Sequence, residues 1–131
     1  MKTEAEILDD ISRYIASTNL KKQITGDVYT DKRPTNSANE DIFVHVLATF
    51  PAQIQTALIN VRIYVPNVQR QTDSVRNKKR IRELSKLAMD ILSSHIQDGW
   101  YIVMEEQSVE ESVDNRQHVI INRIYYRYCN N

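Results

Sequence analysis

The stretch "QTALINVRIYVP", residues 55–66, decides the fold, because apolar and polar side chains alternate along it at the period of a β-strand. One face of this strand is wholly apolar and consists of Ala57, Ile59, Val61, Ile63 and Val65. The other face is mixed and consists of Thr56, Leu58, Asn60, Arg62 and Tyr64. Pro66 lacks a backbone N–H, so the pattern predicts a strand over residues 55–65 that stops there.

A second strand is predicted just before it, over residues 41–50. Its alternating faces are both fairly apolar, with Ile42, Val44 and Val46 on one and Phe43, His45 and Leu47 on the other. Such a pattern is typical of the middle of a sheet, so we expect this strand to be central or covered on both faces. A shorter strand is predicted over residues 23–30, where the apolar pattern is interrupted around Gly26.

The last third of the chain predicts a hairpin. Residues 100–109 and 117–128 both read as strands, and the acidic turn "EESVDN" (110–115) joins them. By contrast, residues 31–40, "DKRPTNSANE", are polar and carry no apolar periodicity. We expect this stretch to be an exposed and mobile loop.

A first helix is predicted over residues 3–17. Thr3 and Glu6 match a capping box, in which each side chain binds the other residue's free backbone N–H. The apolar residues that follow at helical spacing are Ile7, Leu8, Ile11 and Ile15.

A second helix is predicted from a cap at Asp73 or Ser74 to about Ile96, with Asp98-Gly99 as its stop. Its apolar stripe consists of Ile81, Leu84, Leu87, Ala88, Ile91, Leu92 and Ile96. The opposite side of this helix is rich in Lys and Arg.

The predicted elements give the order α-β-β-β-α-β-β in one domain, residues 1–131. We expect an α+β fold, with a mostly antiparallel sheet of four to five strands and two helices packed on one face. Hydrophobic residues make up 41% and charged residues 26%, which is typical of a globular chain. No apolar stretch approaches the ~20 residues of a membrane span, so we expect a soluble protein made in the cytoplasm, without a membrane partner.

The sequence contains little that binds cofactors or metals. It has two glycines, Gly26 and Gly99, whereas phosphate-binding loops need several. The three histidines have no pair at the spacing of a zinc site, and the single cysteine, Cys129, allows neither an internal disulfide nor a thiolate cage. We therefore expect no cofactor and no metal.

Four acidic residues near the hairpin are candidate catalytic carboxylates, namely Glu105, Glu106, Glu110 and Glu111. Neighbours on a strand point to opposite faces, and a hairpin tip is screened by water, so a solvated acidic turn is the preferred interpretation. No nucleophile motif is present. We therefore expect no enzymatic activity, although an enzyme subunit whose site is completed by a partner stays open.

Charge is strongly separated along a chain of zero net charge. Residues 70–86 hold seven basic and two acidic residues, a net charge of +5, while residues 98–114 hold six acids and no Lys or Arg, a net charge of −6. The basic run fits a nucleic-acid contact or a solvated helix face. It also fits a head-to-tail contact in which one copy's basic helix start meets the next copy's acidic hairpin.

Aromatic residues cluster near the predicted hairpin, namely Trp100, Tyr101, Tyr125, Tyr126 and Tyr128. Beside Arg123 and Arg127 they could stack nucleic-acid bases. Tyr126 and Tyr128 share a strand face with Ile120 and Ile124, however, which favours packing in the core.

The stretches "ALINVRIYVP" and "RIRELSKLAMDIL", with "HVIINRIYYRY" near the end, resemble the head-to-tail joining or tail-completion (tail-terminator-like) proteins of long-tailed bacteriophages or prophages. The first two resemble that family's long strand and the helix packed against it, and the third its closing strand. The resemblance spans roughly residues 4–128 and implies a non-enzymatic virion component, made in the bacterial cytoplasm. It also implies a ring, often a hexamer, placed at the head–tail neck or at the tail end.

On this interpretation the partners are copies of the chain itself together with neck and tail-tube proteins, and DNA passing through the ring lumen can touch some basic residues. The expected contacts between copies join Arg76, Lys78, Lys79, Arg80 and Arg82 to Glu105, Glu106, Glu110 and Glu111. The alternative is a small nucleic-acid-binding domain that uses the basic helix over residues 76–86.

Overall fold

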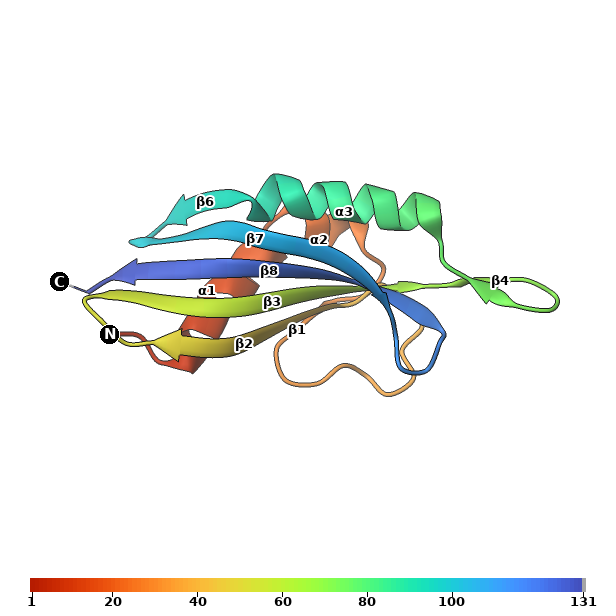
Figure 1. The fold of residues 1–131 in the computed structure, drawn as a ribbon, viewed down its shortest axis with the longest axis horizontal. Coiled ribbons are helices and arrows are strands. Elements are labelled where there is room, and N and C mark those ends of the chain that lie inside the picture. Colours follow the sequence, from red (N-terminus) through yellow and green to blue (C-terminus); the bar gives the residue numbers. More distant parts are fainter. Residues whose placement is uncertain (131) are drawn as a thin grey trace.

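The structure, a computed structural model, describes residues 1–130, and its helices pack against one curled sheet (Figure 1). The helices are α1 (Glu4–Ala16), α2 (Asn19–Gln23) and α3 (Lys78–Leu92). The sheet strands are β1 (Val28–Tyr29), β2 (Ile42–Phe50), β3 (Ile54–Pro66), β6 (Ser94–Gln97), β7 (Trp100–Glu111) and β8 (Gln117–Cys129). They lie in the order β1-β2-β3-β8-β7-β6, and every neighbouring pair is antiparallel except β1 and β2.

The predicted α+β class with a mostly antiparallel sheet is confirmed, but the counts are wrong. The main sheet has six strands instead of four to five, a separate two-stranded hairpin stands beside it, and three helices are present among residues 1–130 instead of two. The additional elements are all short. Short elements carry too few residues for a period to show.

The core lies between the helices and one face of the sheet. The apolar face predicted for residues 55–65 is confirmed, because its residues from Ala57 to Val65 are at most 1% exposed. They pack against α1 through Ile7, Ile11 and Ile15 and against α3 through Ile81, Leu84, Ala88 and Leu92. Tyr126 is fully buried in this core and Tyr128 packs against it, as expected.

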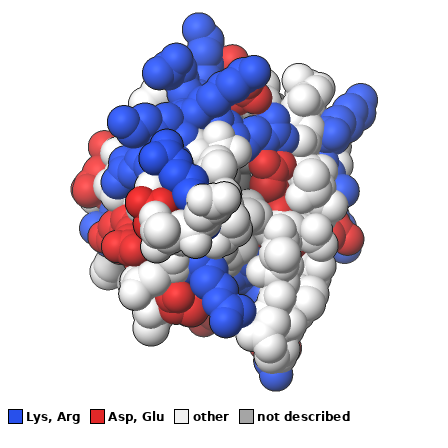
Figure 2. Space-filling model, turned by 90° about the vertical axis from the view of Figure 1, so that its right-hand side faces the viewer, with Lys and Arg blue, Asp and Glu red and all other residues white. Residues whose placement is uncertain are grey.

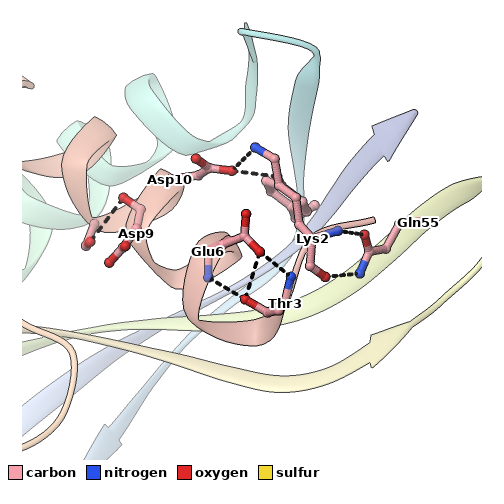
Figure 3. Close-up of polar contacts among 8 residues, drawn as sticks. Lys2, Thr3, Glu6, Asp9, Asp10 and Gln55 are labelled. Carbon is pink, nitrogen blue, oxygen red and sulfur yellow. Dashed lines mark hydrogen bonds and ion pairs between the residues drawn. The ribbon is translucent and has the colours of Figure 1, made fainter. Parts of the chain in front are cut away.

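The start of α1 confirms the predicted capping box (Figure 3). The Thr3 amide donates to Glu6 Oε1 over 3.1 Å, and the Glu6 amide donates to Thr3 Oγ1 over 3.2 Å. Just before the helix, Lys2 and Gln55 exchange two hydrogen bonds of 2.9 and 2.7 Å, and Lys2 Nζ lies 2.6 Å from Asp10 Oδ2. These contacts tie α1 to β3.

The prediction that the second helix runs to about Ile96 is wrong. Helix α3 ends at Leu92, and β6 pairs with β7 through a tight turn. Asp98 and Gly99 form that turn with positive φ angles of 45° and 83°. A pair of left-handed residues closes a two-residue hairpin, so Asp98-Gly99 reverses a strand instead of ending a helix. Ile96 is 78% exposed and never belonged to the buried stripe.

The start predicted for this helix is also wrong. Its N-cap is Asn77, whose side chain accepts from the Arg80 amide, and not Asp73 or Ser74. The preceding residues form a hairpin of β4 (Val68–Gln69) and β5 (Ser74–Val75), which projects from the body of the molecule (Figure 1). Helix α3 is held to β7 and β8 by Gln107 Nε2, which donates to Ser85 O and to Asn122 Oδ1.

The strand predicted over residues 23–30 is largely wrong. Residues 19–23 form helix α2, and only Val28 and Tyr29 pair with β2. Gly26 shows why the strand is broken, because a Cβ there would lie 2.0 Å from Asp41 Oδ1 and 2.7 Å from Glu40 O. The chain therefore turns against the Glu40–Asp41 backbone before it can extend.

Most of the 31–40 stretch is exposed, but three of its side chains are anchored. Arg33 donates to buried Asp41 and to Gln117, and its guanidinium stacks 3.6 Å from the Tyr64 ring centre. Ser37 Oγ also donates to Asp41, over 2.6 Å. The third, Glu40, is buried and forms an ion pair with Arg80 of α3. Arg33 therefore fastens the stretch to the sheet, and Glu40 fastens its end to α3.

Strand β2 corrects the expectation of cover on both faces. Ile42, Val44 and Val46 are buried against the helices, whereas His45 and Leu47 on the other side are exposed. No helix covers this second face within residues 1–130, and we call it the open face. Both faces of β2 are apolar, but only one belongs to the core.

Candidate functional site

The outward side of α3 carries a row of exposed side chains directly opposite its buried residues. Helical spacing of three to four residues aligns them, and we call this row the outer stripe: Lys79, Arg82, Lys86, Met89 and Asp90. None of these side chains takes part in a hydrogen bond or ion pair with another described residue. The stripe is basic at the start of the helix and ends in an apolar and an acidic residue.

The basic residues proposed from the sequence gather at one end of the molecule. Arg76, Lys78, Lys79 and Arg82 are all exposed around the start of α3. Figure 2 views this end of the molecule and shows Lys and Arg side chains massed at its top, over the start of α3.

Arg80, the fifth basic residue proposed for the contact, already forms ion pairs inside the molecule. Its guanidinium donates to both Glu40 carboxylate oxygens over 2.6 and 2.8 Å, and it also donates to Glu83 and to the Gln23 carbonyl. The hydrogen bond to Glu40 raises the pKa of Arg80 further, against the opposing effect of burial. Because Glu40 is buried, this pair locks α3 onto the segment before β2 and leaves no free charge for a partner.

All four acidic residues lie on β7, which was predicted for Glu105 and Glu106 but not for Glu110 and Glu111, which were expected at the hairpin tip. Glu110 and Glu111 are the last residues of β7, and the tip is formed by the residues between them and Gln117. A bulge between Met104 and Glu106 leaves Glu105 without a partner in the register. Glu106 lies opposite Arg123 and Glu110 opposite Val119, which puts both carboxylates on the open face.

Several polar side chains lie close together on the open face, and two of their buried atoms have no hydrogen-bond partner. Asn60, Arg62 and Arg123 occupy adjacent positions on β3 and β8, and with Glu106 and Glu110 they line a groove of about 240 Å³. Asn60 is only 4% exposed, yet its Oδ1 has no hydrogen-bond partner, and the buried Arg62 Nε also has none. No ion pair joins these arginines to the two glutamates within the part of the chain that the structure describes. A buried polar atom that has no hydrogen-bond partner costs free energy.

The other half of the open face is apolar. Leu58, Tyr125 and Val103 stand side by side on β3, β8 and β7. Next to them Phe50 and Ile54 are 55% and 58% exposed. An apolar patch beside charged groups is typical of a surface that contacts another macromolecule. Of the aromatic residues considered for base stacking, Tyr101 is exposed and Tyr125 is partly exposed on this face.

A polar cluster that the sequence pattern did not indicate lies at the base of the β4–β5 hairpin. His118 is buried, and its Nδ1 lies 2.6 Å from Asn67 Oδ1. Asn67 Nδ2 donates to Ser74 and to Asn115 O, so its Oδ1 is the acceptor and His118 Nδ1 carries the proton. Burial lowers the pKa of His118, and the nearby Arg76 lowers it further while Glu111 opposes both.

Comparison with protein-family models and with curated proteins finds no match to this chain. Among residues 1–130, no three His, Cys, Asp or Glu side chains are grouped so that they could hold a metal ion. Within the same range, no helix combines the length and the apolar character that a membrane crossing requires. The candidate functional features described above are three surfaces: the outer stripe, the open face and the basic end, which consists of Arg76, Lys78, Lys79 and Arg82.

Proposed function

We propose that the chain is a non-enzymatic structural protein of a long-tailed bacteriophage or prophage, which assembles into a ring at the head–tail neck or at the tail end. Copies meet through complementary charged surfaces, and neck and tail-tube proteins are the neighbours. The observation that carries this proposal is the position of the charged side chains that have no ion-pair partner among the described residues. Basic side chains lie on the outer side of the helix layer, whereas Glu106 and Glu110 lie on the open face of the sheet.

Opposite placement matters because a ring needs two different surfaces on each copy, one for each neighbour. If both patches lay on the same side, copies would pair face to face and stop at a dimer. The zero net charge supports association, since copies do not repel one another at long range. Within this scheme Arg80 is a residue of the fold and not of the contact.

The experiment compares two double charge reversals of equal net charge. Lys79→Glu with Arg82→Glu removes the basic contact without touching an internal ion pair, whereas Lys22→Glu with Lys32→Glu alters exposed residues elsewhere. In sedimentation velocity the first variant should shift toward monomer and the control should assemble like the parent chain. Equal assembly of all three proteins would contradict the proposed contact.

A second candidate is nucleic-acid binding by the same basic end, and the massing of Lys and Arg in Figure 2 is the observation that favours it. Binding through phosphates should weaken steeply as salt rises, because counterions are released. A titration with duplex DNA at low and at physiological salt separates the two candidates. Tight binding at low salt that is lost in the Lys79→Glu, Arg82→Glu variant would favour the nucleic-acid candidate.

A further inference from the structure

Strand β6, the end strand of the main sheet, leaves its outer edge open (Figure 1). It pairs only with β7, and the Met104 amide donates to Ser93 O just before the strand begins. In an antiparallel pair, residues bonded to the partner strand alternate with residues whose N–H and C=O point away from it. Since Ser93 is bonded to β7, the backbone groups of Ser94 and Ile96 point outward.

These outward backbone groups are accessible and unpaired. Ser94 is exposed, and Ile96 is 78% exposed. Neither residue has a backbone hydrogen bond on this outer side to any other residue that the structure describes. The strand, "SHIQ" (94–97), contains no Lys, no proline and no bulge, which are features that block a strand edge. A further strand can therefore add to it.

The opposite edge of the sheet, by contrast, is covered. The Ile42 amide donates to Asp27 O, away from β3, so the backbone groups of Val44 and Val46 point outward in the same way. These two residues are nevertheless only 0% and 6% exposed. The β2 edge of another copy is therefore not available to pair with β6.

We propose that β6 pairs with β6 of a second copy, antiparallel about a two-fold axis, with Ser94 opposite Ile96 of the second copy. In this register each outward N–H meets an outward C=O. Ser94 and Ile96 of the second copy exchange two hydrogen bonds, and the symmetry repeats the exchange, so no outward group of the paired stretch is left over. His95 lies on the axis opposite its own copy, and its backbone bonds stay with β7.

A second copy fits this edge better than a flexible peptide does. Strand β6 is already extended, because β7 and the Asp98-Gly99 turn hold it, so pairing two copies orders little additional chain. A disordered segment would lose conformational entropy on binding the same few groups. Residues 94–97 include no Lys, Arg, Asp or Glu, so self-pairing places no like charges directly opposite each other.

This contact goes beyond the proposed function and is independent of it. It uses neither the basic end nor the glutamates of β7, and a two-fold contact joins copies in pairs without building a ring. Four residues are fewer than the about five to six of an average strand, so we expect a weak dimer. Salt weakens contacts between exposed charges, whereas this pairing joins uncharged groups and should persist at high salt.

The first experiment compares Ile96→Pro with Ile96→Thr by sedimentation velocity in about 1 M salt, where charged contacts are screened. Proline removes an N–H that points away from β7, so the fold should be kept, and matching melting curves check this. Dimerisation should weaken at least about tenfold in Ile96→Pro, which loses a hydrogen bond at both symmetric positions. Threonine keeps the N–H and should weaken it much less. Equal association of the proline variant and the parent, or equal losses in both variants, would overturn the backbone pairing.

The second experiment tests the register with disulfides in a Cys129→Ser background. Ser94→Cys and Ile96→Cys place thiols on residues that lie opposite each other between copies, about 5.5 Å apart at Cα, which a disulfide can bridge. The same residue in the two copies lies on a diagonal of about 7–8 Å, which is less favourable. Oxidation of an equal mixture should therefore give mainly the mixed disulfide. Symmetrical disulfides that form as fast as the mixed one would overturn the register.

Failure of this pairing is distinguishable from failure of the proposed function. A parent chain that is monomeric in about 1 M salt but assembles at low salt would overturn the β6 pairing and leave the charged ring contact standing. A dimer that persists at high salt in Lys79→Glu with Arg82→Glu, but not in Ile96→Pro, would support the pairing even where no ring forms.

Discussion

The two faces of the sheet are built from the same strands but differ in whether their side chains are buried or have partners within the chain. On β3 the residues that face the helices, from Ala57 to Val65, are at most 1% exposed and lie in one continuous core. On the other side of the same strand Leu58 stays partly exposed, while Asn60 and Arg62 keep polar atoms without partners. The helix-side face is covered by the helices, whereas the open face keeps exposed apolar side chains and buried polar atoms without partners.

This difference separates residues that stabilise the monomer from residues available for contact. Burial of the helix-side face supplies the hydrophobic free energy of folding. The open face holds apolar and charged groups in an ordered pattern that the monomer does not use. Substitutions on the two faces should therefore affect different measurements.

The largest expected effect comes from a matched pair of truncations on neighbouring positions of β3. Ile59→Ala should lower the free energy of unfolding by about 3–4 kcal/mol, because it opens a cavity in the core. Leu58→Ala on the open face should lower it by less than about 1 kcal/mol. Urea unfolding of both variants measures the difference, and equal losses would show that the open face is covered within the monomer.

The second effect distinguishes Arg80, which is ion-paired inside the molecule, from its exposed basic neighbours on α3. Arg80→Ala leaves the buried Glu40 carboxylate unpaired and should cost about 2–3 kcal/mol of unfolding free energy, allowing for partial exposure of the pair. Lys79→Ala, one residue away and exposed, should change stability by no more than about 0.5 kcal/mol. The same urea experiment serves as the test, and comparable losses for both would remove the distinction.

The third effect is a dependence of stability on pH. The pKa of His118 is lowered in the folded chain, mainly by burial, so the unfolded chain binds the proton more readily. Stability should be full above the ordinary histidine pKa of about 6.5 and should fall as pH drops below it. Chemical unfolding between about pH 8 and pH 5 measures this slope. In His118→Gln, whose amide can still donate to Asn67, the fall should be smaller, and an unchanged slope would assign it to other groups.

The smallest effect concerns the helix start. Thr3→Ala removes the side chain that accepts from the Glu6 amide and should cost about 1 kcal/mol. Thr3→Ser keeps the hydroxyl and should stay close to the parent chain. Thermal unfolding compares the two, and an equal loss in both variants would mean that the cap contributes through methyl packing instead of the hydrogen bond.

Much of the fold could be predicted because its long elements are periodic. Residues 55–65 alternate strictly enough to fix both type and face, and the β7–β8 hairpin is indicated by two strand-like segments joined by a polar turn. The ending of α3 was missed because Ile96 fits a helical stripe, although Asp98-Gly99 is a strong hairpin signal. The β4–β5 hairpin was missed because two-residue strands show no period.

The candidate site could be predicted only in part. The charges of α3 and β7 are visible in the sequence, but their placement on opposite layers depends on the sheet order. The Arg80–Glu40 pair joins residues that are distant along the chain, so no local pattern distinguishes Arg80 from Lys79. The apolar residues on both sides of β2 likewise cannot show which side another copy would cover.

The central claim is that copies of this chain contact one another through the surfaces that the monomer leaves unsatisfied. Sedimentation equilibrium of the unmodified chain, from micromolar to millimolar concentration at low and high salt, tests it most directly. The account predicts a mass that rises with concentration toward a closed assembly and falls when salt screens the charged contacts. A monomeric mass at every concentration and at both salt levels would contradict it.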